Sequence, residues 1–213
     1  MTLALIPEPH RLRLGRGWFS VPARPEIGIA DQEFHAAAVA AREVLPRAAI
    51  AASAPGVRDA LRIARGRDLK PQGYRLRIEA SGIRLEAATP SGAFYGVQTL
   101  CQIVRQSPAG KLPALAIEDW PDFADRGVYY DVCRGRVPML ASLFHLADTL
   151  AEHKINQLQL YVEHTFAFRR HPLIGRGCSP LTAEDILELD AFCAERGIEL
   201  LPSLASFGHM ARI

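Results

Sequence analysis

The stretch Gln157-Leu-Gln-Leu-Tyr-Val162 is the middle one of three short apolar runs that decide the fold of the second half of this chain. The other two runs are residues 127–132 and residues 198–203. Helical patterns separate the three runs: one begins at Pro138, and the other follows Thr182-Ala-Glu-Asp185, which has the form of a capping box. The order β-α-β-α-β with connections of this length is typical of a parallel sheet.

The first half has a different rhythm, which predicts an α+β region. Residues 74–79 and 83–87 both alternate apolar and charged side chains and are joined by Ser81-Gly82, so they predict a hairpin. Apolar residues at helical spacing from Gly92 to about Gln106 predict a helix after the hairpin. The remaining expected elements are strands at 18–21 and 61–64, a helix at 31–45 capped by Asp31, and a connector at 108–113.

Composition excludes several classes of protein. The chain has 213 residues, of which 49% are hydrophobic and 23% charged, as in an ordinary globular protein. A net charge of +2 gives little support to nucleic-acid binding, and no apolar run reaches the roughly 20 residues of a membrane span. The four cysteines form no CxxC pair and are read as reduced thiols, and the lack of a signal-peptide pattern makes the cytoplasm the expected location.

Polar side chains follow each of the three apolar runs. Because ligands of parallel α/β folds bind at the carboxyl ends of the strands, these groups predict a functional cleft, although loops are polar in any case. Arg134 and Arg136 fit sugar or phosphate contacts and fit a solvated loop equally well. The three groups are Asp131, Cys133, Arg134 and Arg136 after the first run, Glu163, His164 and Thr165 after the second, and Ser206, Gly208 and His209 after the third.

Other kinds of site find little support. His164 and His171 lack the tight spacing of metal ligands, so no metal and no cofactor are expected. Gly92-Ala-Phe-Tyr-Gly96 opens a helix without a phosphate-binding glycine pattern, and no Gly-x-Ser-x-Gly elbow is present.

Five segments, taken in order, resemble family 20 of the glycoside hydrolases, the β-N-acetylhexosaminidases. Gly73-Tyr-Arg-Leu-Arg-Ile78 and Ala88-Thr-Pro-Ser-Gly-Ala-Phe-Tyr-Gly-Val-Gln-Thr-Leu100 are similar to the N-terminal domain of that family. The segment from Ile117-Glu-Asp-Trp-Pro-Asp-Phe123 to Arg126-Gly-Val-Tyr-Tyr-Asp-Val-Cys-Arg134 resembles the start of its catalytic barrel. His153-Lys-Ile-Asn-Gln-Leu158 and Ser206-Phe-Gly-His209 continue the resemblance, which covers nearly the whole chain.

The resemblance implies a fold and an activity. The expected fold is α/β, with a small α+β domain at 1–115 followed at 119–213 by about three β/α units of an incomplete (β/α)₈ TIM barrel. The implied reaction removes terminal N-acetylglucosamine or N-acetylgalactosamine with retention, and the substrate's own acetamido oxygen attacks the anomeric carbon. In this family an Asp orients the acetamido group and the adjacent Glu is the general acid/base. The expected partner is a glycan that contains N-acetylhexosamine.

The resemblance also assigns substrate-binding residues. Arg126 matches an arginine that hydrogen-bonds sugar hydroxyls, Asp131 an aspartate near the pocket, and His209 a pocket histidine. Glu163 and His164 fall where many members have paired acidic residues, so His164 departs from the pattern. By pattern alone Arg126 precedes its strand and belongs to the far end of the barrel, so the assignment requires its side chain to reach inward along the strand.

The catalytic pair of the family is an Asp-Glu dipeptide, and this sequence contains none. A closed barrel needs about 250 residues, many more than residues 119–213 supply. The first hypothesis is therefore a fragment of a β-N-acetylhexosaminidase that is inactive alone. The second is a non-catalytic carbohydrate-binding module, or one that a second chain completes at the open barrel edge. A third is another α/β enzyme that shares only the barrel start, since fold does not fix function.

Overall fold

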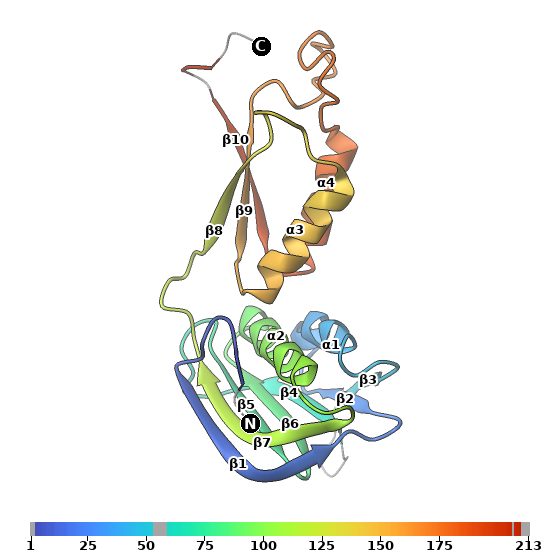
Figure 1. Cartoon of the computed structure of the whole chain (residues 1–213), viewed down its shortest axis with the longest axis vertical. Coiled ribbons are helices and arrows are strands. Elements are labelled where there is room, and N and C mark those ends of the chain that lie inside the picture. The colour runs from blue at the N-terminus through green and yellow to red at the C-terminus, as the bar shows by residue number, and fades with distance from the viewer. Residues whose placement is uncertain (1–2, 53–58, 206, 210–213) are drawn as a thin grey trace. The chain divides into compact units, whose positions relative to one another are not determined.

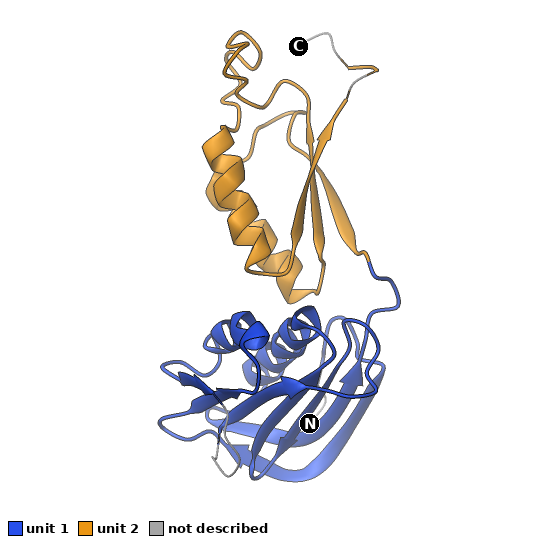
Figure 2. Cartoon of the chain, turned by 180° about the vertical axis from the view of Figure 1, so that it is seen from behind, with its two compact units in different colours: residues 1–124 blue, residues 125–213 orange. Residues whose placement is uncertain are grey.

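The structure is a computed structural model, and it describes residues 3–52, 59–205 and 207–209. The chain divides into two compact units, residues 1–124 and residues 125–213 (Figure 2). The expected boundary at residue 115 falls inside a strand that ends at Asp119 and belongs to the first unit. Among the described residues, the helices are all too short or too polar to cross a membrane.

The first unit is a seven-stranded mixed sheet with helices on one face (Figure 1). The strands lie in the order β1-β7-β5-β6-β4-β2-β3. Their bounds are β1 Arg11–Ser20, β2 Glu26–Ile29, β3 Ala49–Ala52, β4 Leu61–Arg65, β5 Tyr74–Glu79, β6 Gly82–Ala87 and β7 Lys111–Asp119. The helices are the single 3₁₀ turn η1 Gln32–Phe34, α1 His35–Ala41 and α2 Pro90–Arg105.

The predicted hairpin is confirmed as β5 and β6, which pair antiparallel from Tyr74 opposite Ala87 to Glu79 opposite Gly82. Gly82 has φ +147° at the turn, a conformation that L side chains rarely adopt. Alternation sends one set of side chains, including Leu85, to the helix-covered face and the charged set to the opposite face. α2 lies close above the apolar set, because a Cβ at Gly96 would be 2.4 Å from Leu85 Cδ1.

Two expectations for the first unit are wrong in detail. Residues 108–113 are not simply a connector, because β7 begins at Lys111 and pairs with both β1 and β5. Pro113 is tolerated within β7 because the pairing with β5 starts only at Leu115, so no ladder hydrogen bond to β5 is lost. The predicted helix at 31–45 is instead η1, capped by Asp31, followed by the seven-residue α1.

The second unit is a three-stranded parallel sheet in the order β10-β9-β8. Its predicted β-α-β-α-β order is confirmed, with β8 Gly127–Asp131, α3 Leu140–Glu152, β9 Gln157–Val162, α4 Ala183–Ala194 and β10 Glu199–Leu204. Thr182 and Asp185 form the predicted capping box of α4. Leu158 and Leu160 of β9 are buried, as are Leu143 of α3 and Leu189 of α4. Both helices lie on one face of the sheet (Figure 1). That the unit is part of a barrel stays a prediction.

Candidate functional site

The carboxyl ends of β8 and β9 bring the candidate residues together. Parallel pairing places Asp131 of β8 directly beside Tyr161 of β9. Glu163 comes two residues after Tyr161, so strand alternation directs it to the same face. This face is opposite the one on which Leu158 and Leu160 are buried, so the polar groups gather on the helix-free side of the sheet.

Asp131 is held by the turn that follows its own strand. Its Oδ1 accepts hydrogen bonds from the backbone N–H groups of Cys133 at 2.9 Å and Arg134 at 3.1 Å, and from the Cys133 thiol at 3.1 Å. Its Oδ2 accepts from Arg134 Nη1 at 2.7 Å. Partial burial raises the pKa of Asp131, but these hydrogen bonds outweigh it and lower the pKa from 3.8 to about 2. The carboxylate is therefore ionised at neutral pH.

Glu163 is the buried centre of the cluster, with only 8% of the residue exposed. Its Oε1 accepts hydrogen bonds from the Tyr161 hydroxyl at 2.9 Å and from Arg134 Nη2 at 3.4 Å. The Tyr161 hydrogen bond is the main cause that lowers the pKa of Glu163; desolvation opposes it, and the charge of Arg134 adds to it. A carboxylate this well supplied with donors stays ionised although it is buried.

Arg134 links the two carboxylates, and sequence reasoning left its role open. Its guanidinium bonds to both Asp131 and Glu163 and lies 5.1 Å from the centre of the Tyr161 ring, within cation–π range. More than half of its side chain is exposed, so it also offers donors to solvent. The signal that could have found it is its spacing, three residues after a strand-end aspartate, where a turn returns the side chain to that carboxylate.

Cys133 fixes the turn and has no nucleophilic character. The thiol is buried, and desolvation together with the hydrogen bond to Asp131 raises its pKa to about 12. It is therefore protonated at neutral pH, and only a thiolate would attack a sugar carbon.

Two histidines lie beside Glu163 at longer range. His164 Nδ1 is 3.9 Å from Glu163 Oε2, and the His164 side chain is largely buried. His209 Nδ1 is 3.9 Å from Glu163 Oε1, and its side chain is mostly exposed. Ser206, the other candidate after the third strand, lies outside the described residues. The structure thus groups Asp131, Glu163, His164 and His209, while their role in binding sugar stays a prediction.

Arg126 is not part of this group. It precedes β8 at the amino end of the sheet, where its backbone N–H donates to Asn156 Oδ1 at 2.7 Å and its Nε donates to the Lys154 carbonyl at 2.8 Å. These bonds tie the start of β8 to the loop before β9. The structure therefore places Arg126 at the opposite end of the strand from Asp131, and the arginine that reaches the candidate site is Arg134.

The arrangement is suited to binding rather than to proton donation. Two ionised carboxylates and an arginine offer acceptors and donors in fixed positions, as recognition of sugar hydroxyls requires. The pKa values of Asp131 and Glu163 are both lowered, whereas a general acid needs a raised one. Among the described residues, no group of three or more His, Cys, Asp or Glu side chains is arranged to hold a metal ion.

Known proteins match the chain along most of its length. The family model for glycosyl hydrolase family 20, domain 2, matches residues 2–120. A β-hexosaminidase of Akkermansia muciniphila is 30% identical in an alignment 162 residues long, which covers 66% of this chain and 32% of that protein. The chain thus spans about a third of that relative's length.

Solved structures share the fold at lower identity. The Streptomyces plicatus N-acetyl-β-hexosaminidase in complex with Thio-NAglucal has a TM-score of 0.83 at 23% identity, covering 96% of this chain and 46% of that one. The exo-β-N-acetylglucosaminidase of Vibrio harveyi in complex with N-acetylglucosamine has a TM-score of 0.80 at 19% identity, covering 93% and 35%. Since the family model matches more than half of the residues, this chain belongs to glycosyl hydrolase family 20.

Proposed function

We propose that this chain supplies the glycan-binding part of a β-N-acetylhexosaminidase-type glycoside hydrolase. The observation that carries the proposal is the cluster of Asp131, Arg134 and Glu163 at the carboxyl edge of a parallel sheet in a family 20 chain. Supporting it, relatives and structural neighbours are β-hexosaminidases, and one neighbour is complexed with N-acetylglucosamine. The proposed ligand is the terminal N-acetylhexosamine of a glycan.

The cluster provides what a sugar ring needs on one side. Asp131 and Glu163 stay ionised and accept from hydroxyl groups, whereas the exposed edge of the Arg134 guanidinium donates to ring-substituent oxygens. The Arg134 bonds hold both carboxylates in place before a ligand arrives, so little ordering entropy is lost on binding.

The hydrolytic step itself belongs to different residues in this proposal. Substrate-assisted hydrolysis needs a general acid and an acetamido-orienting aspartate, which in this family form an Asp-Glu pair. The sequence holds no such pair, and the two carboxylates of the cluster have lowered pKa values. We therefore expect the 213-residue chain to bind the sugar without turning it over.

Titration of the 213-residue chain with N-acetylglucosamine, followed by calorimetry or amide NMR shifts, tests the binding. Loss of a charge-assisted hydrogen bond in D131N or E163Q should weaken binding at least about tenfold. D148N is the matched control, because Asp148 lies in the same unit but pairs with Arg196 on the helix surface. If D131N and the parent chain bound N-acetylglucosamine equally well, the proposal that this cluster binds the sugar would be contradicted.

An assay with a chromogenic N-acetylglucosaminide tests the catalytic half separately. We expect no turnover above that of the heat-denatured chain. Robust turnover that survives repeated purification would contradict the expectation that this chain binds the sugar without hydrolysing it.

A second candidate function is a module that pairs with another chain. Among the described strands of the second unit, β8 and β10 are edges, and both expose apolar side chains: Tyr129 is 56% and Leu204 53% exposed. Edge strands of this kind are templates for further pairing. Light scattering over a concentration series tests this function, and a folded monomer at all concentrations with no affinity for sugar would exclude it.

A further inference from the structure

The charged face of the first sheet, opposite α1 and α2, carries two neighbouring rows of side chains that run across the strands. In the first row β1, β7, β5 and β6 contribute alternating charges. Arg11 bonds to Glu118 at 3.3 Å, and Arg75 lies 3.7 Å from Glu118 and 3.3 Å from Glu86. Each charge in this row therefore has a neighbour of opposite sign on the next strand.

The second row is one pleat further along the same strands and has a single sign. Arg77 of β5 pairs in register with Arg84 of β6, and Arg84 pairs in register with Arg62 of β4. Gly28 of β2 and Ala116 of β7 end this run of three, one on each side. Within the part of the chain that the structure describes, these three guanidinium groups form no ion pair.

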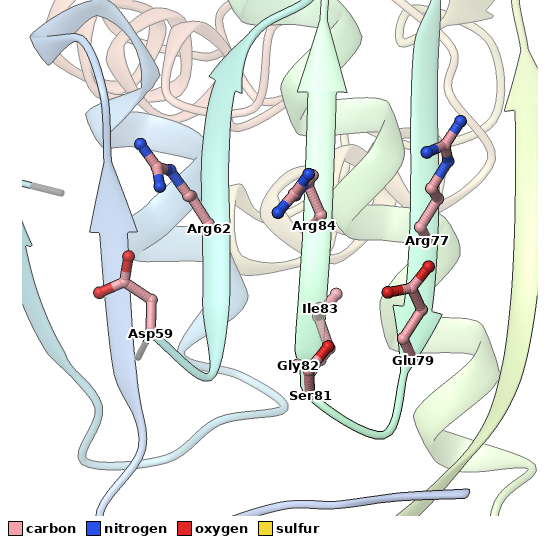
Figure 3. Close-up of a pocket in the computed structure, with 8 residues that line it drawn as sticks. All are labelled: Asp59, Arg62, Arg77, Glu79, Ser81, Gly82, Ile83 and Arg84. Atoms are coloured by element: carbon pink, nitrogen blue, oxygen red, sulfur yellow. The ribbon is translucent and has the colours of Figure 1, made fainter. Parts of the chain in front are cut away.

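The three arginines line a hollow of about 180 Å³ over the β5–β6 turn. Figure 3 shows them side by side on neighbouring strands, with Asp59 at the β4 end of the row and Glu79 below Arg77 at the other end. The Asp59 carboxylate lies over Gly28, since a Cβ there would be 2.1 Å from Asp59 Oδ2. Arg84 therefore stands between two arginines, and both carboxylates stand at the outer ends.

Three arginines in register repel one another and lower the stability of the sheet unless an anion neutralises their charge. Like charges directly opposite each other on paired strands are destabilising. Neighbouring strands are roughly 4.8 Å apart, so the backbone positions of the three arginines span about 10 Å across the strands. Their long side chains therefore place three positive charges on one short stretch of this face. Arginine forks match the oxygens of phosphate and sulfate groups and bind them with two parallel hydrogen bonds.

We propose that the Arg62–Arg84–Arg77 row is a binding site for a small oxyanion, a phosphate or sulfate group. The end carboxylates limit the size of the ligand: a compact group over Arg84 contacts three positive charges, whereas an extended polyanion along the row meets Asp59 and Glu79. The oxyanion is either a free ion or an ester on a sugar. The site belongs to the first unit and does not depend on the proposed sugar binding in the second.

Calorimetric titration of the 213-residue chain in a low-salt chloride buffer tests the site, with inorganic phosphate, inorganic sulfate and glucose 6-phosphate as separate ligands. R84Q should weaken binding at least about tenfold, because it removes a charged donor group. R62Q and R77Q should each weaken it as well, which keeps the test valid if one variant fails to fold.

R13Q is the matched control, because Arg13 lies in the same row on β1 but is separated from Arg77 by Ala116. It changes the net charge as R84Q does, and we expect its affinity to stay within about twofold of the parent chain. Tighter binding of glucose 6-phosphate than of inorganic phosphate identifies a sugar ester as the ligand, and equal binding identifies the free ion.

Two results would overturn the proposal. One is the absence of saturable binding for all three ligands. The other is an equal loss in R13Q and R84Q, which would mean that net charge rather than the row attracts the anion.

Discussion

The two sheets of this chain have the same layered arrangement but differ in the signs of the charged side chains that meet on their helix-free faces. Each sheet has a helix-covered apolar face and an opposite face with polar side chains. In the second unit the opposite face brings Asp131, Arg134 and Glu163 together, and their signs complement each other. In the first unit the helix-free face brings three arginines of neighbouring strands together in register. Strand alternation decides which face a side chain occupies, and the sequence decides whether neighbouring charges on that face are opposite or alike.

The difference has a direct chemical consequence. Where signs complement each other, hydrogen bonds lower the carboxylate pKa values and fix the side chains before any ligand binds. Where one sign dominates, the positive charge has to be compensated by solvent ions or by a bound anion. The cluster of Asp131, Arg134 and Glu163 is therefore preorganised for a neutral, hydroxyl-rich ligand. The row of three arginines favours an oxyanion.

The largest expected effect comes from breaking the apolar face that supports the arginine row. Leu85 of β6 is fully buried against α2, so L85A should destabilise the first unit by about 3 kcal/mol through lost burial and the remaining cavity. Hydrogen exchange of the β5 and β6 amides under native conditions measures it. V39A on the same unit, where Val39 is 47% exposed, should change stability by less than about 0.5 kcal/mol. Equal losses in the two variants would refute the assignment of Leu85 to the core.

The next largest loss of stability is expected from the cluster of Asp131, Arg134 and Glu163. The pKa of Asp131 is depressed, so its contribution to stability is fully present above its ordinary pKa of 3.8 and disappears as pH falls toward about 2. D131N should cost on the order of 1–2 kcal/mol at pH 7, reduced from the full shift because the side chain is partly exposed to solvent. Urea titrations of both proteins from pH 7 to pH 2 measure the difference. A gap that stays constant over this range would show that the carboxylate charge is not its cause.

A smaller effect is expected when charges of the arginine row are made to alternate in sign, as they do in the neighbouring row. R84E places a carboxylate between Arg62 and Arg77, which turns two like-charge pairs into two opposite ones. We expect the first unit to gain about 0.5–1 kcal/mol at low salt and to lose affinity for phosphate. Since exposed charges are screened, the gain should shrink at 1 M salt. A destabilised R84E with phosphate binding intact would contradict both the repulsion and the site.

Sequence patterns predict the parts of the fold in which one strand or helix carries its own signal. The β5–β6 hairpin was predictable because alternation and a turn glycine coincide within residues 74–87. β2 and β3 were missed because Glu26-Ile-Gly-Ile29 and Ala49-Ile-Ala-Ala52 are too short for a periodicity to emerge. They are strands because of the neighbours with which they pair.

The same reason explains what was predictable in the two clusters. The strand-end positions of Asp131 and Glu163 follow from topology alone, so the sequence places them at one edge. The choice of Arg134 over Arg126 depends on a contact with Glu163, which is 29 residues away in the sequence, and no local pattern contains it. The arginine row depends on strand order, because β4 pairs directly with β6 in parallel although β5 comes between them in the sequence.

The smallest expected effect is that of an ion pair outside either cluster. Asp148 accepts a hydrogen bond from Arg196 Nε at 2.6 Å, but its side chain is more than half exposed, and the Arg196 guanidinium also lies 3.3 Å from the centre of the Phe192 ring. D148N should therefore change the free energy of unfolding by less than about 0.5 kcal/mol, since an exposed surface pair contributes little and Arg196 keeps Glu195 at 3.7 Å. Urea titrations of D148N and D131N at pH 7 compare the two losses of stability within the same structural unit. If D148N cost as much as D131N, the distinction between a partly buried cluster and an exposed ion pair would fail, because the same exchange of carboxylate for amide would have the same effect in both places.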